Sequence, residues 1–316
     1  MTPAGTASRY RLLVTDLDGT LLGRRGGVHP SDRRAINELQ RRRVQVSILT
    51  GRLYSGTREI AHSLGVSGPI GCVDGSHIVD ASTDRDLLLC TIAPAAATSL
   101  CAWLREADTV TFLLSGDTVV HDPIGEPYLP YLTLWTRRTR AVRDVLDEAS
   151  SSGPPAPTAV ITIGERDPIL DVRDRIDADA AGALQAAAFS LDAAGLEGLW
   201  AMMVRASGPS KATAVDWIAR HHGLIRDEIV AVGDWYNDVP MLQAAGRSFA
   251  MGQAPPEVKA AATDRLRATV ATGGGITEVR HATAASAATG TSAPTAPRSA
   301  SQPTAAERAP RRRIGA

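Results

Sequence analysis

The chain has 316 residues, which is enough for two domains and a substantial buried core. Its 34 Lys and Arg residues balance its 34 Asp and Glu residues, so the formal net charge is zero. This balance argues against a protein that holds nucleic acid through phosphate contacts. The apolar runs are shorter than a membrane span, and residues 1–9 lack the apolar core of a signal peptide. We therefore expect a cytoplasmic protein with no membrane partner.

Cysteine and lysine are both used sparingly. Cys72, Cys90 and Cys101 form an odd, widely spaced set, which favours reduced, buried thiols over disulfides or a zinc site. Only two of the 34 basic residues are lysines, Lys211 and Lys259. A lysine in such a chain indicates a role that the planar guanidinium of arginine does not fill.

The first part of the chain alternates short apolar strands with helices. We expect a strand at 11–15, a helix at 30–43, and a strand at 44–49 that ends at Thr50-Gly51-Arg52. A helix, a strand, a tight turn and a strand follow at 55–64, 69–73, Asp74-Gly75 and 77–79. This alternation predicts a parallel α/β sheet.

The middle of the chain, residues 83–204, has a different pattern. Its expected elements are helices at 95–106 and 169–179, a hairpin at 109–121 turned at Gly116-Asp117, and strands at 159–163, 183–191 and 199–205. The α/β alternation then resumes, with a helix at 211–221, strands at 228–232 and 248–251, and a helix at 256–263. The sequence thus predicts an α/β parallel-sheet core that is split by an inserted α+β domain.

This pattern divides the chain into four parts. They are an N-terminal extension at 1–9, a catalytic core from 10–82 and 205–280, an inserted domain at 83–204, and a tail at 281–316. The tail consists mainly of Ala, Thr, Ser and Pro, a composition that cannot bury a core. We expect the tail to be disordered.

Two carboxylates follow the first predicted strand. Asp16 and Asp18 are one residue apart at its C-terminal end, the edge of a parallel sheet where ligands bind. Two ionised carboxylates so close together favour a hard cation such as Mg2+ between them. Asp16, directly at the strand end, is the candidate nucleophile, and Asp18 is the candidate general acid and base. An acidic turn without chemistry is the alternative.

Three later segments bring complementary groups to the same edge. The Thr50 hydroxyl, the Gly51 N–H and the Lys211 ammonium could hold phosphate oxygens. Asp234 completes a metal site with the Asp16 side chain and the Asp18 backbone carbonyl. Two further residues, Asn237 and Asp238, could support phosphate or metal binding, or could only cap the following helix. A solvated lysine at a helix start is the alternative for Lys211.

These residues resemble the four motifs of the haloacid dehalogenase-like hydrolase superfamily. The motifs are Asp16-Leu17-Asp18-Gly19-Thr20, Thr50-Gly51-Arg52, Lys211, and Gly233-Asp234-x-x-Asn237-Asp238. The insertion between the second and third motifs resembles a type C2 cap, which points to the Cof-like subfamily. The resemblance implies a Rossmann-like core, a mobile cap, an Mg2+ cofactor, and hydrolysis of small phosphate esters, often sugar phosphates.

Two positions depart from the family pattern. Asp74-Gly75 stands where the family commonly has Asn-Gly, and Gly252-Gln253-Ala254 replaces a common Gly-Asn-Ala. Neither change removes a catalytic group, but either could alter substrate contacts. Substrate choice is expected to depend on the cap, where the aromatic and basic side chains at 126–138 could grip a substrate or could simply pack.

The sequence therefore favours a phosphatase that acts on a small phosphorylated metabolite through an aspartyl-phosphate. A phosphosugar mutase or phosphotransferase would share this intermediate but exclude water. A non-catalytic phospho-ligand sensor is the alternative from another class of protein, although such a sensor could lose the nucleophile without penalty.

Overall fold

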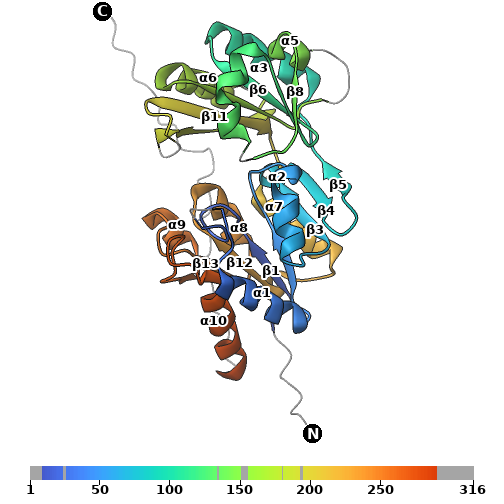
Figure 1. The fold of residues 1–316 in the computed structure, drawn as a ribbon, viewed down its shortest axis with the longest axis vertical. Helices are drawn as coiled ribbons and strands as arrows, with labels where there is room; N and C mark the ends of the chain where they lie inside the picture. Colours follow the sequence, from blue (N-terminus) through green and yellow to red (C-terminus); the bar gives the residue numbers. More distant parts are fainter. Residues whose placement is uncertain are drawn as a thin grey trace, which may run out of the picture.

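Two α/β bodies, each built around its own sheet, lie one above the other along the long axis of the molecule (Figure 1). The computed structural model describes residues 9–23, 26–133, 135–150, 156–179, 181–192 and 195–289. No helix within these ranges is both long and apolar enough to span a bilayer.

The first sheet is parallel throughout, with the strand order β14-β13-β12-β1-β2. Its strands are β1 (Leu12–Thr15), β2 (Gln45–Ile48), β12 (Ile229–Gly233), β13 (Arg247–Ala250) and β14 (Asp264–Arg265). Because β1 lies between β2 and β12, the residues that follow these strands meet at one edge of the sheet. The predicted α/β fold class is confirmed.

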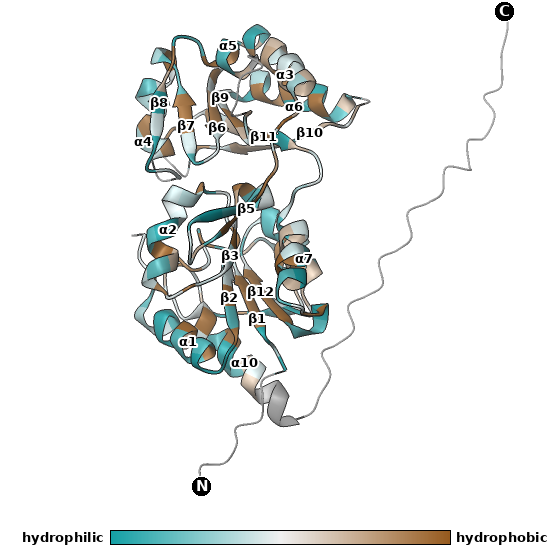
Figure 2. Ribbon diagram, turned by 90° about the vertical axis from the view of Figure 1, so that its right-hand side faces the viewer, coloured by the Kyte–Doolittle hydropathy of each residue, from teal (hydrophilic) through white to brown (hydrophobic). Residues whose placement is uncertain are grey.

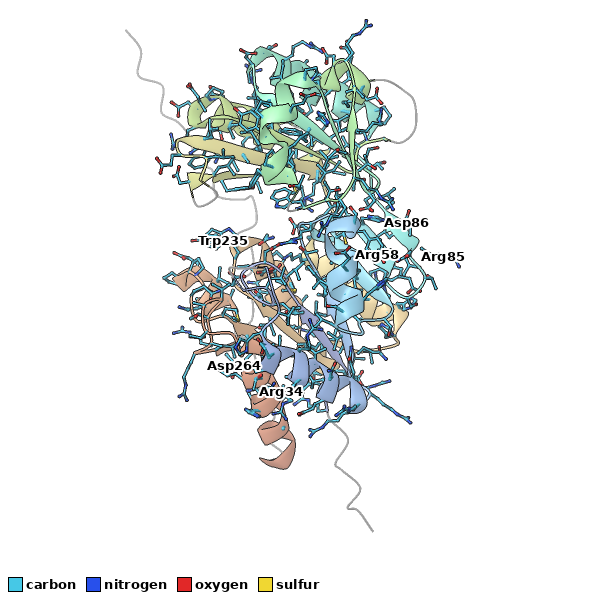
Figure 3. All side chains as sticks on the ribbon, viewed as in Figure 1. Arg34, Arg58, Arg85, Asp86, Trp235 and Asp264 are labelled. Carbon is cyan, nitrogen blue, oxygen red and sulfur yellow. The ribbon has the colours of Figure 1, made fainter. Side chains whose placement is uncertain are left out.

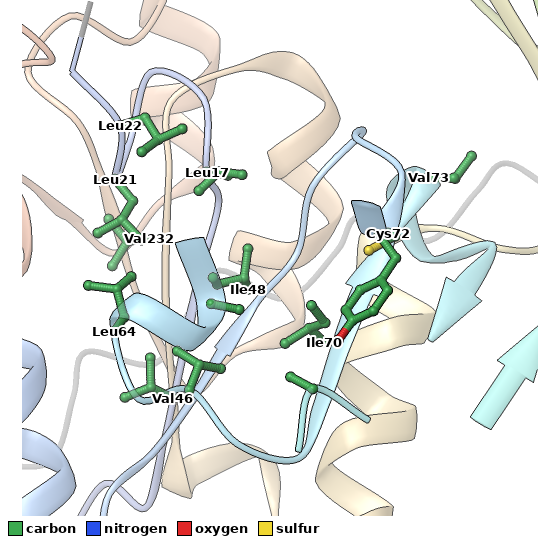
Figure 4. Close-up of a cluster of buried hydrophobic side chains, with 14 of the residues drawn as sticks. Leu17, Leu21, Leu22, Val46, Ile48, Leu64, Ile70, Cys72, Val73 and Val232 are labelled. Carbon is green, nitrogen blue, oxygen red and sulfur yellow. The ribbon is translucent and has the colours of Figure 1, made fainter. Parts of the chain in front are cut away.

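Two apolar layers enclose this sheet, because successive side chains of a strand point to opposite faces. Leu13 belongs to one layer with Ile36, whereas Leu12 belongs to the other with Val215. Figure 4 shows part of the first layer, and Figure 2 shows hydrophobic β12 in the middle of the first body, with a largely hydrophilic α1 to one side of it. The helices of this body are α1 (Pro30–Arg41), α2 (Tyr54–Ser63), α7 (Lys211–His221), α8 (Val239–Ala244), α9 (Pro256–Ala261) and α10 (Gly275–Thr289).

A small antiparallel sheet extends the first body. It contains β3 (Pro69–Cys72), β4 (His77–Asp80) and β5 (Arg85–Leu89), in that order. A parallel bridge between Leu49 and Gly71 connects it to the end of β2. The turn between β3 and β4 is therefore close to the C-terminal edge of the parallel sheet.

The second body is built on six strands in the order β10-β11-β9-β6-β7-β8. They are β6 (Val110–Ser115), β7 (Thr118–His121), β8 (Thr139–Ala141), β9 (Ala159–Glu165), β10 (Leu184–Ser190) and β11 (Leu199–Ala206). Paired strands are antiparallel except β7 and β8. Helices α3 (Pro94–Glu106), α5 (Val145–Ser150) and α6 (Arg166–Ala178) share its apolar cluster, and α4 (Leu129–Leu132) belongs to the cluster that reaches the first body.

The two bodies touch at the start of α2. The Leu53 N–H donates to the Trp135 carbonyl at 3.1 Å, and the Ser55 N–H donates to Asp117 Oδ1 at 2.7 Å. A Cβ added at Gly56 would lie 2.3 Å from the Trp135 carbonyl oxygen. The second body thus supplies hydrogen-bond acceptors to a helix end of the first.

The boundaries of the second body differ from the expected 83–204. β5 pairs with β4, so residues 85–89 belong to the small sheet beside the first body. At the other end, β11 continues to Ala206. β5 was missed because its half-exposed residues show little alternation of polar and apolar side chains.

We expected a disordered tail from residue 281, but helix α10 continues to Thr289. Ile276 and Val279 are buried in the first apolar layer, and Asp32 accepts hydrogen bonds from the Gly274 and Thr277 N–H groups at 2.8 and 3.1 Å. These tertiary contacts hold a helix that composition alone does not predict. Residues 290–316 lie outside the described ranges, as do residues 1–8.

All three cysteines are free, as expected. Cys72 and Cys101 are buried, but Cys90 is only half-buried, so the expectation of burial was wrong for that residue.

Candidate active site

Lys211 lies at the centre of the polar groups that collect at the sheet edge. It is the first residue of α7, whose preceding residue Ser210 caps the helix by accepting a hydrogen bond from Thr213 N–H. Its Nζ lies 2.6 Å from Asp16 Oδ1 and 2.6 Å from Asp238 Oδ1. Only 1% of the residue is exposed, so these carboxylates replace water around the ammonium.

The pKa values around Lys211 reflect crowding of negative charge. Burial alone would lower the pKa of Lys211, but the charges of Asp16 and Asp238 outweigh it and raise that pKa. Burial, reinforced by the charge of Asp238, raises the pKa of Asp16 well above its usual range, although Lys211 opposes the shift. Burial also raises the pKa of Asp234 to about 6. One ammonium does not neutralise these carboxylates.

A cation could occupy the resulting acidic cluster. Carboxylate oxygens of Asp16, Asp234 and Asp238 lie within 4.8 Å of one another, and all three residues are buried. Oxygen donors at this spacing suit a hard cation such as Mg2+. The structure brings Asp238, which the sequence ranked as support, into this cluster.

Asp18 lies apart from the acidic cluster. Its carboxylate is 52% exposed and forms a bidentate pair with Arg52, in which Nε donates to Oδ2 at 2.7 Å and Nη2 donates to Oδ1. Burial and the nearby charge of Asp18 together raise the pKa of Tyr131 to about 12. Tyr131 belongs to α4, so the charge of Asp18 acts on an aromatic residue of the second body.

Asp238 also shapes the loop after β12. Its Oδ2 accepts hydrogen bonds from the N–H groups of Asp234 at 2.8 Å and Trp235 at 3.0 Å. Trp235 and Tyr236 are consequently turned outward and half exposed. Figure 3 shows Trp235 on the edge of the first body nearest the second.

Asp234 is held by residues that the sequence did not single out as ligands. Thr20 Oγ1 donates to its Oδ1 at 2.7 Å, and Gln253 Nε2 donates to its Oδ2 at 3.2 Å. Gly19 has φ +83°, and a Cβ there would lie 2.3 Å from the Asp234 carboxylate. The sequence indicates Gln253 only as a departure from the family pattern, because its hydrogen bond to Asp234 joins residues that are 19 positions apart.

The remaining candidates surround Asp74, which follows β3. Asn237 Nδ2 donates to Asp74 Oδ1 at 3.0 Å, and Lys211 Nζ lies 3.9 Å from the same oxygen. Thr50 is buried, and its Oγ1 accepts a hydrogen bond from the Arg52 N–H at 3.1 Å. A Cβ on Gly51 would lie 3.6 Å from Asp74. Sequence reasoning did not place Asp74 in the site.

The comparisons with known proteins cover most of the chain. A family model for haloacid dehalogenase-like hydrolases matches residues 13–278. The HMP-PP phosphatase of Serratia proteamaculans is 25% identical, with 79% of this chain and 86% of that protein covered. The pyridoxal phosphate phosphatase YbhA of Escherichia coli is 25% identical, with 80% and 91% covered.

Solved structures agree at the level of the fold. A haloacid dehalogenase-like hydrolase from Bacteroides thetaiotaomicron superimposes with a TM-score of 0.73 at 22% identity, with 86% of this chain and 99% of that chain covered. The parallel sheet, the carboxylates at its edge and the extent of the family match lead to one assignment. The chain belongs to the haloacid dehalogenase-like hydrolases.

Proposed function

We propose that the protein is an Mg2+-dependent phosphatase that hydrolyses small phosphate monoesters through an aspartyl-phosphate on Asp16. The observation that carries this proposal is the contact of the buried Lys211 with Asp16 at 2.6 Å. An ammonium at this distance can neutralise a phosphate oxygen beside the attacking carboxylate. The relatives named as phosphatases for HMP-PP and pyridoxal phosphate support a phosphorylated metabolite as substrate, which agrees with the expected cytoplasmic location.

The carboxylates fit a divalent cation. Asp16 and Asp234 have raised pKa values, as expected for buried acids whose negative charge is not fully compensated by a cation. We assign them as Mg2+ ligands together with the Asp18 backbone carbonyl, and Asp238 as a support that also holds Lys211. When bound, Mg2+ would neutralise charge on the nucleophile and on the phosphate.

The reaction follows from the roles of the side chains. The Asp16 carboxylate attacks phosphorus while the bond to the ester oxygen breaks, and Asp18 protonates that leaving oxygen. Asp18 then takes a proton from the water that hydrolyses the aspartyl-phosphate. For the first step Asp18 must leave its pairing with Arg52, because both of its carboxylate oxygens accept hydrogen bonds from that guanidinium and neither can then donate a proton to the leaving oxygen.

Four groups are available to hold the phosphate oxygens. We assign this role to the Thr50 hydroxyl, the Gly51 N–H, Lys211 and Asn237. All four are grouped near Asp74 or the acidic cluster, although they come from separate segments of the chain.

The test measures phosphate release from p-nitrophenyl phosphate with Mg2+, with chelator, and by Asp16→Asn. We expect turnover that requires Mg2+ and falls at least about 1,000-fold in Asp16→Asn, because the amide is not a nucleophile. Asp167→Asn, on an exposed acid of α6, is the control and should be fully active. If the phosphoryl group were transferred to an added sugar and no free phosphate were released, the protein would instead be a mutase or phosphotransferase. Phosphate-ester binding without turnover would identify a sensor.

A further inference from the structure

Asp74 places a carboxylate among the groups that we assign to phosphate binding. Its Oδ1 accepts a hydrogen bond from Asn237 Nδ2 at 3.0 Å and lies 3.9 Å from Lys211 Nζ. It is also next to Gly51, and only 8% of the residue is exposed. A negative charge at this position opposes the binding of a phosphate dianion unless another group compensates it.

The backbone fixes this carboxylate in place. Val73 and Asp74 both have φ +48°, a left-handed conformation that is unusual for any residue other than glycine. The turn is tied to the second motif, because the Val73 N–H donates to the Arg52 carbonyl at 3.0 Å and the Asp74 N–H donates to the Thr50 carbonyl at 2.9 Å. Asp74 therefore has little freedom to turn away from the phosphate groups.

Arg205 faces the outer oxygen of Asp74. It lies on β11 of the second body, and its Nη2 is 3.7 Å from Asp74 Oδ2. Its Nη1 donates to the carbonyls of Val73, Asp74 and Pro209, each at 3.4 Å. Both charged side chains are 11% exposed, so solvent screens them little.

Lys211 is poorly placed to compensate Asp74 by itself. Its ammonium already contacts Asp16 and Asp238, each at 2.6 Å, whereas Asp74 is at 3.9 Å. If Arg205 were absent, Asp74 would compete with phosphate for the field of Lys211. The geometry thus places Lys211 on the inner side of Asp74 and Arg205 on its outer side.

We propose that Arg205 is a positioning residue for phosphate binding, because it compensates the buried charge of Asp74. The proposal rests on the proposed function and adds a residue that no motif contains. Strand β11 would then contribute to phosphate affinity through Arg205.

The test is a double-mutant cycle on Arg205 and Asp74, with p-nitrophenyl phosphate as substrate and Mg2+ in excess. Arg205→Met should raise KM at least about tenfold and change kcat less than threefold, because the unpaired Asp74 repels the substrate. Arg205→Lys, which keeps the charge but not the three carbonyl contacts, should recover most of the affinity. Asp74→Asn should leave KM at or below the wild-type value.

The double variant Asp74→Asn/Arg205→Met is decisive. Its KM should return to within about threefold of the wild type, because no charge remains to be compensated. A double variant whose KM is as high as that of Arg205→Met would overturn the proposal. Arg205 would then serve only to hold the turn through its hydrogen bonds to the backbone. A KM for Arg205→Met equal to that of the wild type would overturn it too.

Calorimetric binding of inorganic phosphate, measured with Mg2+ on the same proteins, separates this proposal from the proposed function. Its dissociation constant should follow the same order as KM. A wild-type protein that neither turns over the ester nor binds phosphate would contradict the proposed function, and this proposal with it. A wild-type protein that does both, while the double variant shows no rescue, would contradict only the role of Arg205.

Discussion

Lys211 illustrates how one residue can link stability to chemistry. Its ammonium is enclosed by protein and contacts the carboxylates of Asp16 and Asp238. Removing one partner from such a buried group of charges leaves the others uncompensated, which is far more costly than losing an exposed ion pair. We therefore expect the residue proposed to hold phosphate to stabilise the fold around the site as well.

Lys211→Met tests this link through stability. We expect the free energy of unfolding to fall by about 3 kcal/mol or more, because buried carboxylates lose their counter-charge. Lys259→Met is the matched control, since Lys259 makes one hydrogen bond, to the Gly252 carbonyl, and should cost about 1 kcal/mol. Urea unfolding without Mg2+ measures both. Equal losses in the two variants would show that the contacts of Lys211 add no stability of their own.

Because of Asp234, the stability of the folded protein should change with pH in a direction that can be predicted. Burial raises its pKa in the folded protein to about 6, above the usual value of 3.8, so the folded state binds the proton more tightly than the unfolded state. Its stabilising contribution is complete below about pH 4 and is lost as the pH rises through about 6.

Comparison of the wild type with Asp234→Asn isolates this effect, because the other acids titrate in both proteins. Without Mg2+, the unfolding free energy of the wild type should fall relative to that of Asp234→Asn between pH 4 and 7, by at most on the order of 3 kcal/mol. Urea unfolding at several pH values measures the difference. A difference that is constant with pH would mean that Asp234 ionises normally in the folded chain.

Among the elements, the two strands that lead into the candidate site are the most predictable part of the chain. β1 and β12 are short apolar runs that end in acids, so both the strands and the position of Asp16 and Asp234 could be read from the sequence. β8 could not, because its three residues are all exposed and only their pairing with β7 defines them. Helix α10 depends on contacts with α1 that are distant in sequence.

The site residues differ in the same way: the local sequence indicates some of them, and only contacts between distant segments indicate the others. Asp16 and Asp234 stand directly after β1 and β12, and Asp18 follows Asp16 by two residues, so the local sequence pattern indicates chemistry there. Asp74 follows a strand as well, but its importance comes from Lys211, more than 100 residues later in the chain. Gln253 is similar, because only the folded chain brings it to Asp234.

Gly56→Ala tests the contact between α2 and the second body. Alanine in place of a helical glycine normally stabilises a protein by up to about 1 kcal/mol. Here the added Cβ would lie 2.3 Å from the Trp135 carbonyl oxygen, so we expect the free energy of unfolding to fall instead. Gly27→Ala, where a Cβ meets no atom within 4 Å, should be nearly neutral. Thermal unfolding of both variants measures this, and a higher Tm for Gly56→Ala would contradict the observed packing.

At the scale of the whole molecule, the proposed active site depends on both bodies. The first supplies the carboxylates, Lys211 and the second motif. The second supplies Tyr131 near Asp18, and Arg205 beside Asp74. The sequence predicted an inserted domain that would affect substrate choice, but the contact of Arg205 with Asp74 required the folded arrangement. We propose that this second body acts as the cap.

If Asp16 carries the phosphoryl group, the intermediate can be trapped on it. Asp18→Asn should form the aspartyl-phosphate but hydrolyse it slowly, because the general base is missing. After brief reaction with p-nitrophenyl phosphate and Mg2+ and an acid quench, mass spectrometry of the tryptic peptide from Leu12 to Arg24 should locate one phosphoryl group on Asp16. The double variant Asp16→Asn/Asp18→Asn should show none. Phosphate on another residue, or wild-type turnover with no phosphoryl group trapped on Asp16, would mean that Asp16 is not the nucleophile.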